Sequence, residues 1–356
     1  MALAHPAGFR EIVSGRARGI WPTLARGCLR LLEIPYTAAV GLRNWRYDTG
    51  RAAIHRASVP VVSVGNLTLG GTGKTPMVEW LARWYAAQHM RVAIVSRGYG
   101  SQAGHANDES LELAQKLPGV PHVLDADRVR GAKCAVDEYA AQLVILDDGF
   151  QHRRLHRDLN ISLVDALEPD GFGHVFPRGT LREPLSGWRR AESIVLTRAD
   201  MVDELTRGQI RAHVMRHAPS AVWIEACYRP KSLLDRAGHE HPLGELQATG
   251  VAAFCGIGNP DGFWRSLEDC GFRLLDRRAF PDHFAYSPAD ADKLASWATQ
   301  AGATALLCTC KDLVKIGPLW TFELPLYALV SRLELLTGAQ PFEALLRRCI
   351  ATQPRA

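Results

Sequence analysis

The residues best suited to chemistry lie in a glycine-rich segment near residue 70. This segment, 65–76, reads GNLTLGGTGKTP and follows a short apolar run. Glycines allow backbone N–H groups to approach phosphate oxygens closely, and a helix that begins where the loop ends adds its dipole. Lys74 can then reach the terminal phosphates, and the hydroxyl of Thr75 can bind Mg²⁺. The segment therefore predicts a loop that binds a nucleoside triphosphate.

This loop departs at one position from the strict pattern G-x-x-x-x-G-K-[ST], because Thr68 stands where the first glycine belongs. The remaining glycines, and the strand and helix that flank the loop, compensate for this departure. The alternative is a glycine turn followed by a chance Lys-Thr pair. We expect bound ATP to contact the whole loop, namely Thr68, Leu69, Gly70, Gly71, Thr72, Gly73, Lys74 and Thr75.

A second candidate motif, LVILDDGFQH, spans residues 143–152. An apolar strand that ends in an acid, here Asp147, delivers a carboxylate to Mg²⁺ at its C-terminal end. Neighbouring side chains of a strand point to opposite faces, so Asp147 and Asp148 cannot both face the metal. One is expected to bind Mg²⁺ and the other to serve a neighbour, and the pattern leaves open which. After a phosphate-binding loop, this motif favours a nucleoside triphosphatase or a kinase.

The segments around these motifs alternate between strand and helix patterns. Apolar runs bounded by polar or turn residues predict strands at 60–65, 91–96, 143–148, 160–165 and 193–197, with a helix at 75–89. This alternation is typical of an α/β fold with a doubly wound, mostly parallel sheet.

The strand pattern restarts near residues 222–228 and indicates a second, smaller α/β lobe. A strand followed by a turn is expected over 250–260, and further strands at 304–309 and 326–331, with helices from about 261 and at 288–301. We therefore expect three parts: N-terminal helices over 1–56, a nucleotide-binding domain over 57–227 and a C-terminal lobe over 228–356.

The N-terminal part is strongly basic, with nine Arg against three acidic residues in 1–56. Residues 20–34 predict an amphipathic helix that stops at Pro35, with leucines on one face and arginines on the other. This pattern is typical of a helix lying in a membrane interface, and it also fits a surface helix docked on the body. A basic segment favours an anionic partner, a membrane or a nucleic acid, unless it is only a solvated face. Its distance in sequence from the loop predicts that Arg26→Glu and Arg30→Glu leave nucleotide affinity unchanged.

The composition excludes several classes of protein. The chain has 356 residues, of which 47% are hydrophobic and 22% charged, which suits a globular protein of about two domains. No run approaches the ~20 apolar residues of a spanning helix. Eight cysteines without a C-x-x-C pair indicate a reducing compartment and no structural metal. The start, MALAHPAGFREIV, lacks the apolar core of a signal peptide, so we expect a cytoplasmic protein.

Seven segments together resemble the tetraacyldisaccharide 4′-kinase family, in order over about residues 20–345. They are SVGNLTLGGTGKTP (63–76), SRGYG (96–100), DDGFQHRRLHRDLNISLVD (147–165), PRGTLREP (177–184), GIGNPDGFW (256–264), FPDHFAYS (280–287) and TCKD (309–312). The phosphate-binding loop alone is weakly specific, but its combination with DDGFQH and the pair Asp282-His283 is highly specific.

The resemblance implies a P-loop kinase-like fold of two α/β lobes, with N-terminal helices that hold the membrane. It also implies an activity: with ATP and Mg²⁺, the family phosphorylates the 4′-hydroxyl of tetraacyldisaccharide 1-phosphate to form lipid IVA. The resemblance implies a peripheral protein at the cytoplasmic face of the bacterial inner membrane. No nucleic acid and no obligate protein partner is expected.

The resemblance also implies roles for individual residues. Asp108 and His283 would form the catalytic base beside Lys74, and Glu109 would be a carboxylate on the metal side. Asn107 replaces a family glycine before Asp108, and the acidic pair could instead be an exposed turn or a helix cap. Arg97, Gln151 and His152 are candidate substrate contacts, although the basic run 151–157 could equally be a solvated loop. Cys310 stands where the family usually has Glu.

Three other functions remain open from the sequence. The first is a GTPase or ATPase switch such as a metallocentre chaperone. Residues 197–200, TRAD, resemble a guanine-reading T-K-x-D, but Arg198 replaces the lysine. The second is a non-catalytic, ATP-binding membrane adaptor. The third is a kinase of soluble sugars, which would not need a basic amphipathic N-terminus.

Overall fold

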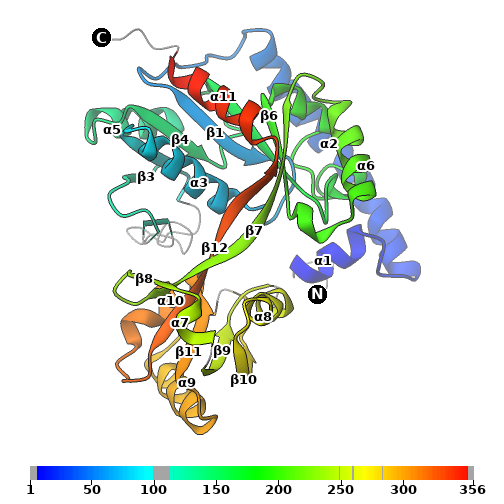
Figure 1. The fold of residues 1–356 in the computed structure, drawn as a ribbon. Coiled ribbons are helices and arrows are strands. Elements are labelled where there is room, and N and C mark those ends of the chain that lie inside the picture. Colours follow the sequence, from blue (N-terminus) through cyan, green and yellow to red (C-terminus); the bar gives the residue numbers. More distant parts are fainter. Residues whose placement is uncertain are drawn as a thin grey trace. The chain divides into compact units, whose positions relative to one another are not determined.

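The computed structural model describes residues 6–98, 113–114, 116–247, 249–258, 260–282 and 284–351. The described residues form two compact units (Figure 1). The first consists of Met1–Arg97, Val120–Cys227 and Glu334–Ala356, and the second of Gly98–Gly119 and Tyr228–Leu333.

The first unit is built on a parallel sheet with the strand order β7-β6-β5-β1-β4-β2-β3. Its strands are β1 (Val61–Asn66), β2 (Val92–Ser96), β3 (His122–Leu124), β4 (Leu143–Asp147), β5 (Leu159–Asp165), β6 (Ser193–Thr197) and β7 (Val222–Asp235). Strands β1 and β4 are buried along their whole length, as expected for the centre of a sheet covered on both faces. The expected doubly wound, mostly parallel sheet is confirmed.

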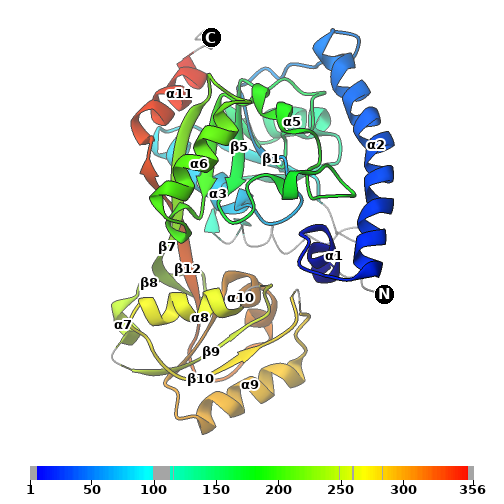
Figure 2. The ribbon, with the colours of Figure 1, turned by 90° about the vertical axis from the view of Figure 1, so that its right-hand side faces the viewer.

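Helices cover this sheet, and the hydrophobic core of the unit lies between them and the strands. They are α3 (Lys74–Ala87), α5 (Arg128–Asp137), α6 (Glu204–Met215) and α11 (Ala339–Ala351). Helix α5 packs Ala132 and Ala135 on Val144 and Leu146 of β4. Helix α6 packs on β6. In Figures 1 and 2, α11 lies on one face of the sheet and α2 (Ile20–Asp48) on the other.

The second unit contains the parallel strands β10-β9-β11-β12. Its elements are β8 (Glu240–Pro242), α7 (Gly244–Gln247), β9 (Gly250–Cys255), α8 (Pro260–Asp269), β10 (Arg273–Ala279), α9 (Pro288–Gln300), β11 (Ala305–Thr309), α10 (Cys310–Ile316) and β12 (Leu326–Thr337). Alternate residues of β9 enter two different cores, Phe254 with α9 and Ala253 with α8. Helices therefore pack on both faces of this smaller sheet as well.

The expected C-terminal part, 228–356, needs one correction. The chain returns to the first unit at Glu334, because α11 packs against α3: the rings of Trp80 and Phe342 stack at 5.7 Å, and Tyr85 donates to the Leu346 carbonyl at 3.4 Å. The chain leaves the first unit within β7 and returns to it within β12.

The N-terminal helices also differ from expectation. Helix α1 spans Pro6–Val13, and α2 runs through Pro35 to Asp48 instead of stopping there. Proline removes one helical hydrogen bond, but contacts between α2 and the body on both sides of Pro35 hold the helix together. Among the described residues, no helix is long and apolar enough to cross a membrane.

Candidate nucleotide-binding site

The phosphate-binding loop leaves the centre of the first sheet, where β1 lies between β4 and β5. Gly73 has φ of 85°, a left-handed conformation that favours glycine, and it precedes the first turn of α3 at Lys74. The loop backbone pairs with a segment over residues 174–183. Leu69 N donates to Thr180 O, and Arg182 N to Leu67 O, each at 2.6 Å. The loop is therefore held along one edge by a second strand-like segment.

Three loop carbonyls are also held by side chains. The Thr197 hydroxyl donates to Thr72 O at 3.0 Å, and Arg198 donates to Gly71 O at 3.1 Å. Arg10 of α1 donates to Leu69 O at 3.4 Å. The TRAD segment, which resembled a guanine-reading motif, thus supports the loop. These contacts limit the conformations that the loop must lose when a phosphate binds.

Lys74 lies among oxygen atoms at the C-terminal ends of β1 and β4. Its Nζ is 3.4 Å from Asn66 Oδ1 and 3.6 Å from Asp148 Oδ1. Burial would raise the pKa of Asp148, but the charges of Lys74 and Arg182 outweigh it and hold that pKa below its usual value. Asp148 is therefore ionised at neutral pH and faces two cations.

Asp147 and Asp148 occupy different environments, as the alternation of a strand predicts. Asp147 is the last residue of β4, is buried, and lies in register with Val64 of β1. Asp148 has φ of 54°, so the chain leaves the strand at this residue. Asp148 contacts two cations of the protein, which favours Asp147 as the predicted metal ligand.

Arg128, at the start of α5, is a site residue that sequence reasoning missed. Its side chain is buried, and it donates to Asp125 O at 2.8 Å. Burial lowers the pKa of Arg128, while the charges of Asp148 and Asp147 raise it, so the guanidinium interacts electrostatically with both acids. Arg97, an expected substrate contact, is exposed at the end of β2 and also acts on Arg128 electrostatically.

The side chains of Gln151 and His152 interact with other residues of the protein. Gln151 Nε2 donates to Asn66 O at 2.9 Å and to Glu183 at 3.1 Å. Burial, with the charge of Arg128 nearby, lowers the pKa of His152 to about 4, so the ring is neutral at pH 7. The predicted substrate role of both residues stays a prediction.

The basic run 151–157 is not a solvated loop. Arg153 pairs with Asp48 of α2 at 2.6 Å, and Arg154 pairs with Asp127 at 2.9 Å. Burial lowers the pKa of Arg157 to about 10. Three of its arginines therefore join α2, α5 and the sheet within the first unit.

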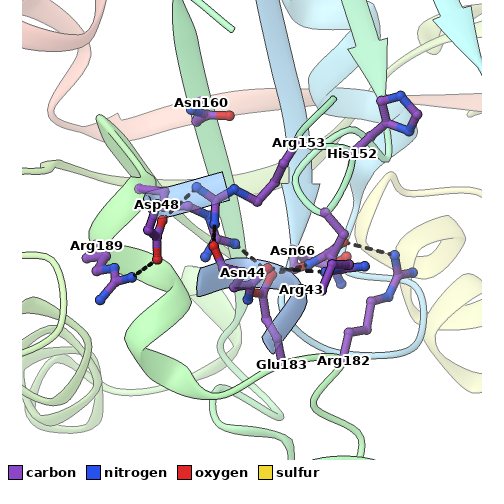
Figure 3. Close-up of polar contacts among 12 residues, drawn as sticks. Arg43, Asn44, Asp48, Asn66, His152, Arg153, Asn160, Arg182, Glu183 and Arg189 are labelled. Carbon is purple, nitrogen blue, oxygen red and sulfur yellow. Dashed lines mark hydrogen bonds and ion pairs between the residues drawn. The ribbon is translucent and has the colours of Figure 1, made fainter. Parts of the chain in front are cut away.

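A buried carboxylate, Glu183, organises the polar contacts behind the loop (Figure 3). Its side chain is 0% exposed. It accepts hydrogen bonds from Arg190 at 2.7 Å, Asn44 of α2 at 2.8 Å and Gln151 at 3.1 Å. Figure 3 also shows the neighbouring pairs of Asp48 with Arg153 and Arg189. A single buried acid thus links the N-terminal helix to residues beside the phosphate-binding loop.

The second unit brings three motifs together around Asp312, which is 1% exposed. Asp312 accepts from Gly256 N at 3.0 Å, from the Tyr286 hydroxyl at 2.8 Å and from the Thr309 hydroxyl at 2.6 Å. Burial and the charge of Asp312 raise the pKa of Tyr286. The segments GIGN, FAYS and TCKD therefore form one structural unit. Cys310, the departure from the family pattern, is buried and contacts the Leu329 carbonyl at 3.7 Å.

Comparisons with known proteins agree with this geometry. The family described as tetraacyldisaccharide-1-P 4′-kinase matches residues 25–351. The tetraacyldisaccharide 4′-kinase of Desulfatibacillum aliphaticivorans is 39% identical, covering 91% of this chain and 92% of its own length. That of Anaeromyxobacter dehalogenans is also 39% identical, covering 91% and 90%.

The chain belongs to the tetraacyldisaccharide-1-P 4′-kinase family. A solved structure agrees: the crystal structure of LpxK from Aquifex aeolicus in complex with ATP has a TM-score of 0.76 and 31% identity. It covers 92% of this chain and 99% of its own. The resemblance inferred from the motifs is thereby confirmed, and with it the P-loop kinase-like fold.

Not all site residues that the tetraacyldisaccharide-1-P 4′-kinase family implies can be placed. Asp108, Glu109 and His283 lie outside the described residues. The loop residues, Asp147, Asp148, Gln151 and His152 are described, and all of them lie at or beside the C-terminal ends of β1 and β4. This is the edge at which open α/β sheets bind ligands.

The donor set at this edge fits Mg²⁺. Thr75 and Asp147 offer hard oxygen ligands, and Mg²⁺ usually binds one or two carboxylates together with substrate phosphates and water. Within the described ranges, no group of three His, Cys, Asp or Glu residues forms a complete metal cage.

Proposed function

We propose that this chain transfers the γ-phosphate of ATP to the 4′-hydroxyl of tetraacyldisaccharide 1-phosphate, in lipid A biosynthesis. The full-length family match carries this proposal, together with the arrangement of Lys74, Asp148 and Arg182 beside the loop. In the reaction, the bond between the γ-phosphorus and its bridging oxygen breaks and a bond from the sugar oxygen forms. The sugar hydroxyl loses its proton to a base, and ADP leaves.

Each residue has a role in this proposal. Lys74 and the loop N–H groups stabilise charge on the transferred phosphoryl group. Thr75 and Asp147 would hold Mg²⁺, which neutralises phosphate charge when bound, and Glu109 would lie on the metal side. Asp108, with His283, would accept the proton of the acceptor hydroxyl.

We also propose that α2 attaches the enzyme to an anionic membrane surface, at the cytoplasmic face where ATP is available. The argument is the unusual exposure of its apolar residues. Leu31 is 69% exposed and Trp21 82% exposed, whereas Glu33 on the opposite side is 7% exposed. The other exposed apolar residues of α2 are Ile20, Leu24, Leu32, Ile34, Leu42 and Trp45. A helix with exposed leucines and neighbouring arginines is typical of a membrane interface.

The test is incubation of the purified chain with labelled ATP and tetraacyldisaccharide 1-phosphate in detergent micelles. The proposal predicts a bis-phosphorylated lipid. A GTPase switch would prefer GTP and need no lipid, a membrane adaptor would show no turnover, and a soluble-sugar kinase would accept the deacylated disaccharide equally well. Comparison of these four outcomes separates the proposal from each alternative.

A further inference from the structure

Helix α2 has a buried acid where an amphipathic surface helix would have an apolar residue. Glu33 is 7% exposed, and its Oε1 accepts a hydrogen bond from Val175 N at 2.9 Å. Its Oε2 accepts from Arg30 at 2.6 Å and lies 3.4 Å from His174 Nδ1. Burying a carboxylate is costly unless it is bonded in this way. Glu33 is therefore a fixed point of contact between α2 and residues 174–175.

Val175 belongs to the segment that pairs with the phosphate-binding loop. It bridges Leu181, and Phe176 N donates to Leu181 O at 2.8 Å. Leu181 in turn bridges Thr68. A continuous set of backbone contacts thus leads from Glu33 to the loop. A displacement of Val175 would be transmitted to the loop because each step is a direct backbone contact.

A second contact from α2 reaches the same segment one turn further along the helix. The Tyr36 hydroxyl donates to Arg182 O at 3.2 Å. The backbone N–H of Arg182 donates to Leu67 O, and its side chain contacts Asp148. Glu33 and Tyr36 are three residues apart and therefore lie on the same face of α2.

We propose that Glu33 is a positioning residue for the nucleotide site. It holds Val175, which sets the 174–183 segment and, through it, the phosphate-binding loop. Helix α2 is then part of the nucleotide site as well as a surface-facing element. This inference goes beyond the proposed function, because it concerns ATP affinity and does not depend on which acceptor is phosphorylated.

The experiment measures the Kd of ATP by calorimetry for the full chain in detergent, without any acceptor. Glu33→Ala should raise this Kd about tenfold, the equilibrium cost of about one hydrogen bond. Glu33→Gln keeps an acceptor for Val175 N and should stay within about twofold of wild type. Glu11→Ala, an exposed acid of α1, is the matched control and should change nothing.

A purely structural role would lower the melting temperature of Glu33→Ala and leave the Kd of the folded protein unchanged, and that result overturns the proposal. Equal losses in Glu33→Gln and Glu33→Ala would overturn it too, because the acceptor for Val175 would not matter. Tyr36→Phe supplies the test if Glu33→Ala does not fold. It should raise the Kd about two- to threefold, and a wild-type Kd in that variant contradicts the proposal. Because the Kd of ATP is measured without an acceptor, these binding measurements can be interpreted even if the lipid kinase assay gives no product.

Discussion

Asp148 accepts two hydrogen bonds of 2.8 Å from Nη1 of Arg182, one at each carboxylate oxygen. The same carboxylate lies 3.6 Å from Lys74 Nζ. One acid thus joins the end of β4, the first turn of α3 and the 174–183 segment. Two cations face this one negative charge, so we expect Asp148 to orient Lys74 and Arg182 toward the phosphates and Asp147 to bind the metal.

The first prediction concerns this charge balance. Asp148→Asn should lower kcat by at least about a hundredfold, because a neutral amide no longer orients two cations that stabilise the developing phosphate charge. The fold should be retained, as judged by circular dichroism. Asp200→Asn, an exposed acid of the same unit, should keep wild-type kcat. A kcat of Asp148→Asn within threefold of wild type would remove Asp148 from the site.

A second prediction follows from the burial of Glu183. Glu183→Ala should lower the free energy of unfolding of the first unit by about 3–5 kcal/mol, because it leaves Arg190 buried without its carboxylate. Burial already lowers the pKa of Arg190. Glu183→Gln keeps hydrogen-bond capacity, so its free energy of unfolding should fall by less. Urea denaturation measures both values, and a loss below about 1 kcal/mol in Glu183→Ala would contradict the account.

The third prediction is a pH dependence. The pKa of His152 is about 4 in the folded protein, against about 6.5 in an unfolded chain. Between these values the unfolded chain binds more protons, so this contribution to stability is present above about pH 6.5 and is lost as the pH falls toward about 4. The stability of His152→Gln should therefore decline less steeply over that range. Parallel stability curves for wild type and variant would show that His152 titrates normally.

The fourth prediction tests the membrane-facing helix. Leu31→Glu should weaken binding to anionic vesicles about tenfold, since burying a leucine contributes about 1.5–3 kcal/mol. Leu205→Glu is the matched control, because Leu205 is 72% exposed on α6 of the same unit. Vesicle flotation measures the bound fraction of each. Equal binding by the two variants would refute attachment through α2.

Arg26→Glu and Arg30→Glu are less informative than the sequence suggested. Arg26 donates to the carbonyls of Ile12 and Ala17, and Arg30 pairs with Glu33. Both substitutions would disturb the packing of α2 as well as its charge. The expectation that they leave nucleotide affinity unchanged rested on distance in sequence, and Glu33 and Arg10 show that the N-terminal helices contact the loop and its partner segment.

The parts of the fold that sequence reasoning located were those with strong local signals. Buried strands such as β1 and β4 are apolar runs, and the loop before α3 is marked by glycines. Helix α11 and the full length of the strands β7 and β12 were not recognised, because they depend on packing between distant segments. Pro35 ended the predicted helix because local propensity disfavours it, whereas tertiary contacts carry α2 through it.

Within the site, the sequence motifs located the loop and the acids at the end of β4, but not the residues that support them. Arg128 and Arg130 look alike in sequence, yet Arg128 is buried beside the two acids and Arg130 pairs with Asp125 at the surface. Burial of Glu33 and Glu183 could not be foreseen either. Each is buried by partners more than a hundred residues away in the sequence. A local sequence pattern cannot identify such partners.

We expect this chain to phosphorylate a lipid acceptor at its nucleotide site. The most direct measurement compares wild type with Lys74→Ala, using labelled ATP and tetraacyldisaccharide 1-phosphate in micelles. The account predicts that wild type forms a bis-phosphorylated lipid in amounts that require Mg²⁺, and that folded Lys74→Ala forms almost none. Lipid product at the wild-type rate from Lys74→Ala, or no lipid product from a folded, ATP-binding wild type, would contradict it.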